Sequence, residues 1–112
     1  MTIRELVEHL QLEVLCGEAF LERPVTDVYV SDLLSDVLGN AHTGNIWITL
    51  HTHLNVVAVA VQKQLSAIVL VGNHRPDADT LEAAIRVKIP LLCTPKSTFE
   101  TAGLTYQFLH QL

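Results

Sequence analysis

The second half of the chain repeats one pattern, in which a short apolar run is followed by a polar connection and a segment with helical spacing. The apolar runs cover residues 46–50, 67–71 and 90–94, so the unit recurs about every 22 residues, the spacing of tightly connected βα units. Nearly continuous apolar strands are typical of a parallel sheet that is covered on both faces. We therefore expect an α/β fold, a small mostly parallel sheet with helices on both faces, built from consecutive βα units.

One segment of this pattern is ambiguous. Residues 56–61 read Val-Val-Ala-Val-Ala-Val, which would suit a strand on propensity alone. Strands precede and follow this run, and parallel strands need a crossover between them, which favours a helix over residues 55–65. Its almost all-round apolarity indicates burial on several sides, or burial on one side by a partner subunit.

The first half of the chain gives weaker signals. Thr2 and Glu5 form a capping box ahead of a first helix of about nine residues. Residues 12–16 and 25–30 have the alternation of strands. Residues 31–38 fit either a short helix or an irregular loop.

Length and charge limit the classes of function. At 112 residues with no internal change of composition, the chain is expected to be a single domain over residues 1–112. The net charge is −5 and the seven Lys and Arg residues are scattered, which argues against a nucleic-acid partner. The N-terminus lacks the apolar core of a signal peptide, and the longest apolar run is too short to span a bilayer. Cys16 and Cys93 lie within expected strands and are interpreted as reduced structural thiols of a cytoplasmic protein.

Two stretches of the sequence resemble a known domain family. The first covers residues 50–61 and reads Leu-His-Thr-His-Leu-Asn-Val-Val-Ala-Val-Ala-Val. The second covers residues 68–72 and reads Ile-Val-Leu-Val-Gly, with Pro76 shortly after it. The family that both resemble is the DRTGG domain. Such domains occur beside CBS domains in some pyrophosphatases, in some phosphotransacetylases, and as short stand-alone bacterial proteins. They are similar to the N-terminal domain of HPr kinase/phosphorylase. The resemblance implies a regulatory α/β domain that forms a homodimer.

The chain departs from the motif that names this family. Where the family has an Asp-Arg pair, residues 51–53 read His-Thr-His, and where it has Thr-Gly-Gly, residues 71–73 read Val-Gly-Asn, so only Gly72 carries over. The resemblance therefore implies the fold rather than a ligand. Kinase activity is not implied, since no Gly-x-x-x-x-Gly-Lys-Ser/Thr loop occurs.

Ligands of open parallel sheets bind outside the carboxyl ends of the strands. The connections over residues 51–55, 72–77 and 94–97 are expected to meet there. Three helix starts would direct free N–H groups to this rim, and Arg75 would add a planar charged fork, which together suit a phosphate or carboxylate. The candidate ligand-binding residues are Thr52, His53, Asn55, Gly72, Asn73, His74, Arg75, Thr94, Ser97 and Thr98.

A plainer interpretation of the same residues stays open. Thr52 or Asn55, Asp77 and Ser97 have side chains that commonly cap helix N-termini and need no other role. Arg75 could be a solvated surface side chain. On this interpretation the rim binds nothing.

Three histidines raise the question of a metal. His51 and His53 could share an ion, with His74 as a third ligand. Loop histidines are more often hydrogen-bonded surface residues, so we expect no metal and no cofactor. The trio carries the weakest hypothesis, a small metal-dependent enzyme.

Nucleophilic catalysis has still less support. The neighbours at residues 31–32 and 35–36 are Ser-Asp pairs, which usually cap turns or short helices. Cys93 would need exposure and a positive neighbour to be reactive, so it is interpreted as a packing residue. No catalytic residue is expected.

Two hypotheses of function remain. Tyr106 and Phe108 lie on different faces of the expected last helix, and a homodimer would supply a second surface if both pack. The first hypothesis is a non-catalytic regulatory module that dimerises and senses a small anionic ligand, such as a nucleotide, at the rim. The alternative is a protein-docking domain without a small-molecule ligand, which an exposed apolar patch around residues 56–61 would favour.

Overall fold

The computed structural model describes residues 1–111 and is built around one sheet. The strands are β1 (Glu13–Cys16), β2 (Asp27–Val30), β3 (Asn45–Thr49), β4 (Ala67–Leu70) and β5 (Leu91–Cys93). The helices are α1 (Ile3–Leu10), α2 (Leu34–Asn40), α3 (Asn55–Gln62), α4 (Ala78–Val87) and α5 (Thr98–His110), with a single 3-10 turn, η1 (Glu18–Phe20), after β1. The strand order is β1-β5-β4-β3-β2.

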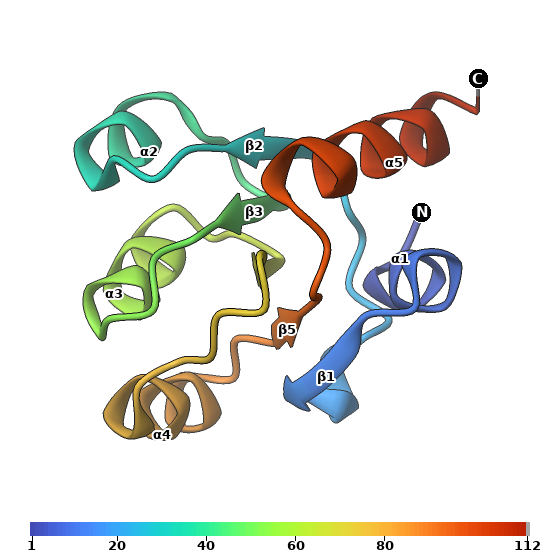
Figure 1. Ribbon diagram of the computed structural model, residues 1–112. Coiled ribbons are helices and arrows are strands. Elements are labelled where there is room, and N and C mark those ends of the chain that lie inside the picture. Colours follow the sequence, from blue (N-terminus) through green and yellow to red (C-terminus); the bar gives the residue numbers. More distant parts are fainter. Residues whose placement is uncertain (112) are drawn as a thin grey trace.

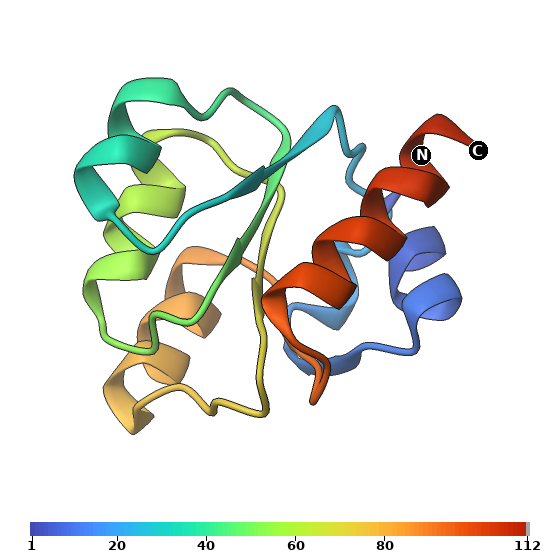
Figure 2. The same cartoon turned by 45° about the horizontal axis from the view of Figure 1, so that its top comes forward.

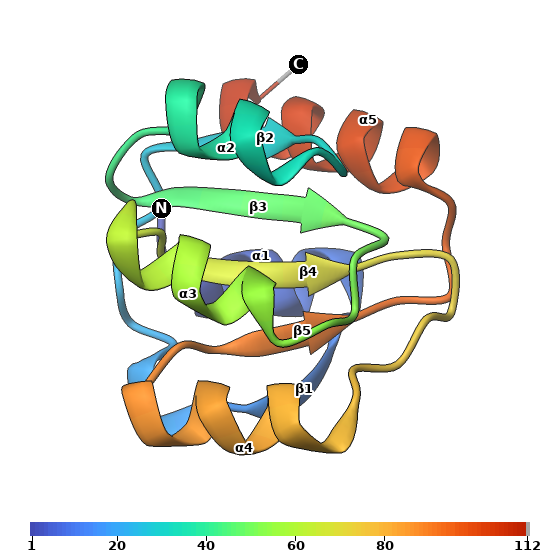
Figure 3. The same ribbon diagram turned by 90° about the vertical axis from the view of Figure 1, so that its left-hand side faces the viewer.

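All strand pairs of the sheet are parallel except the one at its β1 edge. The arrows of β3, β4 and β5 point to the same side in Figure 3, so their carboxyl ends share one rim. Strand β1 runs antiparallel to β5 and places Glu13 opposite Cys93. The start of β1 therefore lies beside the carboxyl end of β5.

The sheet is covered on both faces, with α2, α3 and α4 on one side and α1 and α5 on the other (Figure 1, Figure 2). Successive side chains of a strand point to opposite faces, and the two cores follow this alternation. Trp47 and Ile68 belong to the core beneath α3 and α4, whereas Ile48 and Val69 belong to the core beneath α1 and α5. Burial on both faces explains why the strands are continuously apolar, and it confirms the expected α/β fold.

The helix starts agree only in part with the interpretation as caps. Thr2 and Glu5 form the expected capping box on α1, and Ser97 accepts a hydrogen bond from the Glu100 N–H at 3.1 Å at the start of α5. The N-cap of α3 is Leu54, which has no capping side chain, so the expectation that Thr52 or Asn55 caps this helix was wrong.

Helix α3 ends at Gln62, before the expected residue 65. Gln64 has a φ of 55°, a left-handed conformation that cannot continue a right-handed helix. The Leu65 N–H instead donates to the Ala60 carbonyl at 2.9 Å, which closes the helix end.

Residues 31–38, for which the sequence allowed a short helix or a loop, include the start of α2, which continues to Asn40. The Trp47 side chain is fully buried, and its indole N–H donates to the Ser31 carbonyl at 2.9 Å. The Tyr29 hydroxyl donates to Asp36 of α2 at 2.9 Å. These two bonds join the segment to the core. Within the described residues, no helix is long and apolar enough to cross a membrane.

Candidate functional site

The loop after β3 is held against the start of α4. The carbonyl oxygen of Thr52 accepts a hydrogen bond from the Asp77 N–H at 3.2 Å and another from the Thr80 hydroxyl at 2.9 Å. Thr80 is fully buried, so this contact is part of the packed structure. The first two expected connections of the rim are therefore joined.

The loop after β4 is also joined to the loop after β5. The Gly72 N–H donates to the Lys96 carbonyl at 2.7 Å, and the Asn73 N–H donates to the Thr94 carbonyl at 3.1 Å. Both Gly72 and Asn73 have positive φ, at 68° and 62°. A Cβ on Gly72 would lie 3.2 Å from the His74 ring and 3.3 Å from Leu50, so this position favours glycine both by conformation and by space.

Arg75 is paired within the protein. Its Nη1 lies 3.0 Å from Glu13 Oε1 and its Nη2 lies 3.3 Å from Glu13 Oε2, so the two side chains meet as a bidentate pair. Nη1 also donates to the Sγ of Cys93 at 2.9 Å. Arg75 is therefore an exposed side chain, as the plainer interpretation expected, but it is also paired with Glu13. The hydrogen bonds from Arg75 hold the pKa of Glu13 below its ordinary value.

Cys93 has the positive neighbour that a reactive thiol requires, but it lacks exposure. The residue is 5% exposed, and burial raises the pKa of its thiol. The nearby Glu13 carboxylate raises this pKa further, against the opposing effect of Arg75. The interpretation of Cys93 as a packing residue is supported.

The histidines of the rim do not form a metal centre. His53 Nδ1 lies 2.7 Å from Asp77 Oδ2, and the rings of His51 and His53 are 6.1 Å apart with their planes at 75°. Among residues 1–111 there is no group of three His, Cys, Asp or Glu side chains placed to hold an ion. The hypothesis of a metal-dependent enzyme gains no support from this arrangement.

Two remaining candidates are the first residues of helices, and a third directly follows β5. Asn55 is exposed at the first residue of α3, and Thr98 is half-buried at the first residue of α5. Thr94 is buried, and its hydroxyl accepts from the Lys96 N–H at 3.3 Å. Asp77 stands at the N-cap position of α4, but its side chain contacts His53 and does not cap the helix.

Sequence reasoning did not place two acidic residues at the rim, although it interpreted one of them, Asp32, as part of a turn-capping pair. Asp32 accepts hydrogen bonds from the Thr49 hydroxyl at 2.8 Å and the Leu50 N–H at 2.7 Å, so it closes the end of β3. Glu13 reaches the rim only because β1 is antiparallel. The direction of a four-residue edge strand leaves no signal in the sequence, whereas the Ser-Asp pair at residues 31–32 indicated a turn-capping role for Asp32.

The model of the DRTGG domain family matches residues 5–108. The chain belongs to the DRTGG domain family. This DRTGG domain is similar to a solved structure of the CBS and DRTGG domains of the regulatory region of Clostridium perfringens pyrophosphatase, complexed with the activator diadenosine tetraphosphate. The TM-score is 0.75 and the sequence identity 20%, over 95% of this chain and 46% of that chain. This chain thus spans less than half of that regulatory region. No curated protein sequence matches it.

Proposed function

We propose that this DRTGG domain is a regulatory module without catalytic residues of its own, and that it responds to a small anionic ligand, such as a nucleotide, at the carboxyl-end rim. Two comparisons support this. The family includes a domain of a pyrophosphatase regulatory region, and that region was solved with a nucleotide activator. The fold of this chain is the same, although the likeness in sequence is only 20%.

The observation that carries the proposal is the bidentate hold of Arg75 on a carboxylate. A guanidinium that binds Glu13 through Nη1 and Nη2 has the orientation needed to bind a phosphate or carboxylate of a ligand. Arg75 lies three residues before the first residue of α4, whose N-cap Asp77 makes no side-chain capping bond. The α4 N-terminus, which follows Arg75 closely along the chain, carries partial positive charge of the sign that attracts an anion.

A thermal-shift series tests this site. The full chain is melted with inorganic phosphate, acetate, ATP, GTP and diadenosine tetraphosphate, each in wild type, Arg75→Ala and Arg86→Ala. A ligand at about a hundred times its Kd adds about 2.7 kcal/mol to the free energy of unfolding. We expect at least one phosphate-bearing compound to raise the melting temperature of wild type and of Arg86→Ala, an exposed arginine of α4, but not of Arg75→Ala. Equal shifts in all three proteins would place the ligand elsewhere, and no shift for any compound would remove the proposal.

A second candidate function is docking of a protein partner, and the outer face of α3 favours it. Leu54, Ala58 and Val61 are exposed at helical spacing on this face. With Val87 of α4 they line an apolar groove of about 430 Å³. An exposed apolar patch around residues 56–61 was expected to favour a docking module, and Ala58 and Val61 are the exposed residues of that run.

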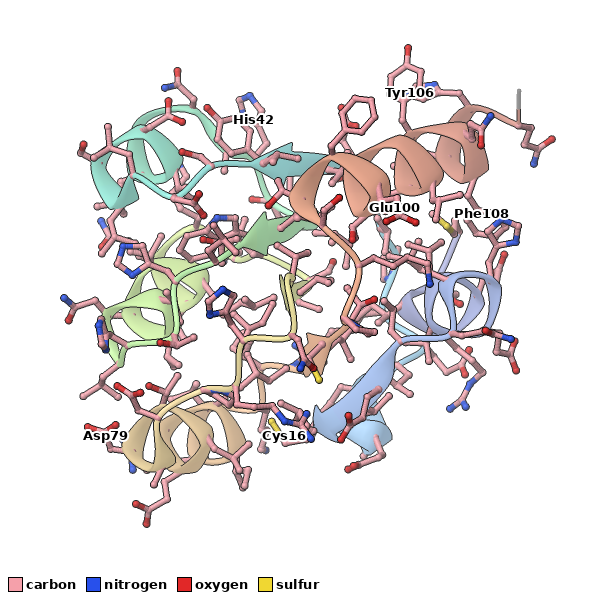
Figure 4. The ribbon with its side chains drawn as sticks, viewed as in Figure 1. Cys16, His42, Asp79, Glu100, Tyr106 and Phe108 are labelled. Carbon is pink, nitrogen blue, oxygen red and sulfur yellow. The ribbon has the colours of Figure 1, made fainter. Side chains whose placement is uncertain are left out.

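The partner we propose for this groove is a second copy of the chain. Helix α5 is the weaker candidate for the dimer surface, because the Phe108 ring stacks on His9 of α1 with centroids 4.2 Å apart within the same chain. Tyr106 points away from the domain (Figure 4). Helix α5 still exposes Phe99 and Tyr106, but the groove beside α3 is the hollow apolar surface that we propose for an isologous contact, in which the same patch of both copies is buried.

Light scattering after size-exclusion chromatography tests the dimer. We expect wild type to elute as a dimer and Val61→Asp as a monomer, because a charge in an apolar interface must be desolvated. Val61 is 46% exposed, so its replacement should change the free energy of unfolding of the monomer by no more than about 0.5 kcal/mol. Gln107→Asp, at an exposed residue of α5, is the matched control and should remain dimeric. A dimeric Val61→Asp or a monomeric wild type would contradict this use of the groove.

The chemistry of the thiols fits a reducing compartment, and we propose the cytoplasm. Cys16 and Cys93 are both free and buried. Cys16 pairs with Leu91 across the β1–β5 ladder, whereas Cys93 pairs with Glu13.

A further inference from the structure

The position that a ligand carboxylate or phosphate would take on Arg75 is filled by a side chain of the protein. Glu13 stands at the first residue of β1, which the antiparallel pairing brings opposite Cys93 at the rim. Both of its oxygens face the guanidinium. Glu13 occupies the end-on position between Nη1 and Nη2, so an anion cannot make this bidentate contact with Arg75 until Glu13 moves.

We propose that Glu13 is an internal competitor that raises the concentration every anion needs to occupy Arg75, so that phosphoryl anions, which bind arginine more tightly than monocarboxylates do, are the class of ligand that can displace it. This inference rests on the proposed function and names the class of ligand. A side chain tethered beside its partner acts at an effective concentration in the millimolar range. A dissolved monocarboxylate offers Arg75 the same chemistry as Glu13 and has to exceed that concentration. A phosphoryl group carries about −1.5 to −2 charge and three acceptor oxygens, so it displaces Glu13 at a lower concentration.

The Glu13 side chain can move into solvent, whereas a further contact holds the Arg75 side chain in place. The Glu13 side chain is 57% exposed and lies on an edge strand, so it can turn into solvent without opening the core. Arg75 keeps its third contact, the 2.9 Å hydrogen bond to the Sγ of the buried Cys93. The guanidinium therefore remains in place at the end of β5 while its carboxylate partner is exchanged. Displacement also frees β1 from the loop before α4, which couples the ligand to the edge of the sheet.

Binding constants of Glu13→Gln test the proposal, because glutamine keeps the shape of the side chain and removes its charge. The probes are inorganic phosphate and acetate, titrated calorimetrically into the full chain. We expect Glu13→Gln to bind phosphate about two- to fivefold more tightly than wild type, the range that the strength of an exposed ion pair allows. We expect acetate to bind Glu13→Gln measurably and wild type less. Glu18→Gln, an exposed glutamate of η1, is the matched control and should behave as wild type.

The outcomes separate this inference from the proposed function. If wild type binds phosphate through Arg75 and Glu13→Gln binds it no more tightly, Glu13 is not a competitor and the rim is still a site. If neither protein binds phosphate, and Arg75→Ala changes nothing, both proposals fall. Binding of phosphate by Glu13→Gln alone would support the competitor if wild type binds a nucleotide through Arg75.

A second readout follows Glu13 itself. Its carboxyl pKa is lowered by the hydrogen bonds from Arg75, and the other titratable group that faces it is the Cys93 thiol. Carbon-detected NMR of the wild-type carboxyl group, titrated with acid, should show that pKa rising toward its ordinary value when phosphate saturates the protein. An unchanged pKa at saturation would mean that the anion binds without displacing Glu13, and would overturn the proposal.

Discussion

Replacing Trp47 with alanine is expected to lower the free energy of unfolding by about 3–5 kcal/mol. The Trp47 side chain is the largest among those that are fully buried in the described part of the chain. Its removal leaves a cavity under α3 and deprives the Ser31 carbonyl of the indole N–H. A domain of this size has about 5–15 kcal/mol of stability in total, so the loss is a large part of it. Urea unfolding followed by circular dichroism measures the change.

Trp47→Phe separates packing from the hydrogen bond. Phenylalanine retains most of the apolar volume and lacks the N–H, so we expect a loss of about 1–2 kcal/mol. An alanine variant within about 1 kcal/mol of wild type would contradict the placement of Trp47 in the core.

Replacing Gly17 with alanine is expected to cost about 2–5 kcal/mol, through two effects. Gly17 has a φ of 89°, a conformation that L side chains rarely adopt. A Cβ at this position would also lie 2.5 Å from the Cα of Pro90, which is backbone and cannot move aside without disturbing β5. Thermal unfolding measures the loss.

The matched control for Gly17 is Gly103→Ala, for which we expect the opposite sign. Gly103 lies inside α5, and a Cβ there would meet nothing within 4 Å. Alanine in an exposed helix interior is more stable than glycine by about 0.5–1 kcal/mol. Equal effects at the two positions would contradict the account of Gly17.

The repeated βα units were predictable because each of them is coded locally. An apolar run of strand length, a polar connection and a helical period occur together from β3 onward, and the sheet order then follows from short parallel crossovers. Residues 31–38 were not predictable, since α2 starts without a capping side chain and is held by Tyr29 and Trp47 from other strands. Tertiary contacts therefore determine the conformation of that segment.

The location of the rim could be predicted from the sequence, but the contacts between its side chains could not. The strand ends located Thr52, Gly72 and Arg75 together, because parallel strands share their carboxyl edge. The partner of Arg75 is 62 positions away in the sequence, on a strand whose direction is set only when it pairs with β5. The contact between His53 and Asp77 could not be predicted either, because it depends on the hydrogen bond that holds the loop before α4 to the Thr52 carbonyl.

The account depends most on whether the rim binds an anion through Arg75, and isothermal titration of wild type and Arg75→Ala with ATP, diadenosine tetraphosphate and inorganic phosphate tests this directly. Loss of a hydrogen-bonded charge partner weakens binding by about tenfold or more. We expect saturable binding of at least one of these compounds to wild type, and binding to Arg75→Ala that is at least tenfold weaker. Equal affinity in the two proteins, or no saturable binding of any of the three to wild type, would contradict it.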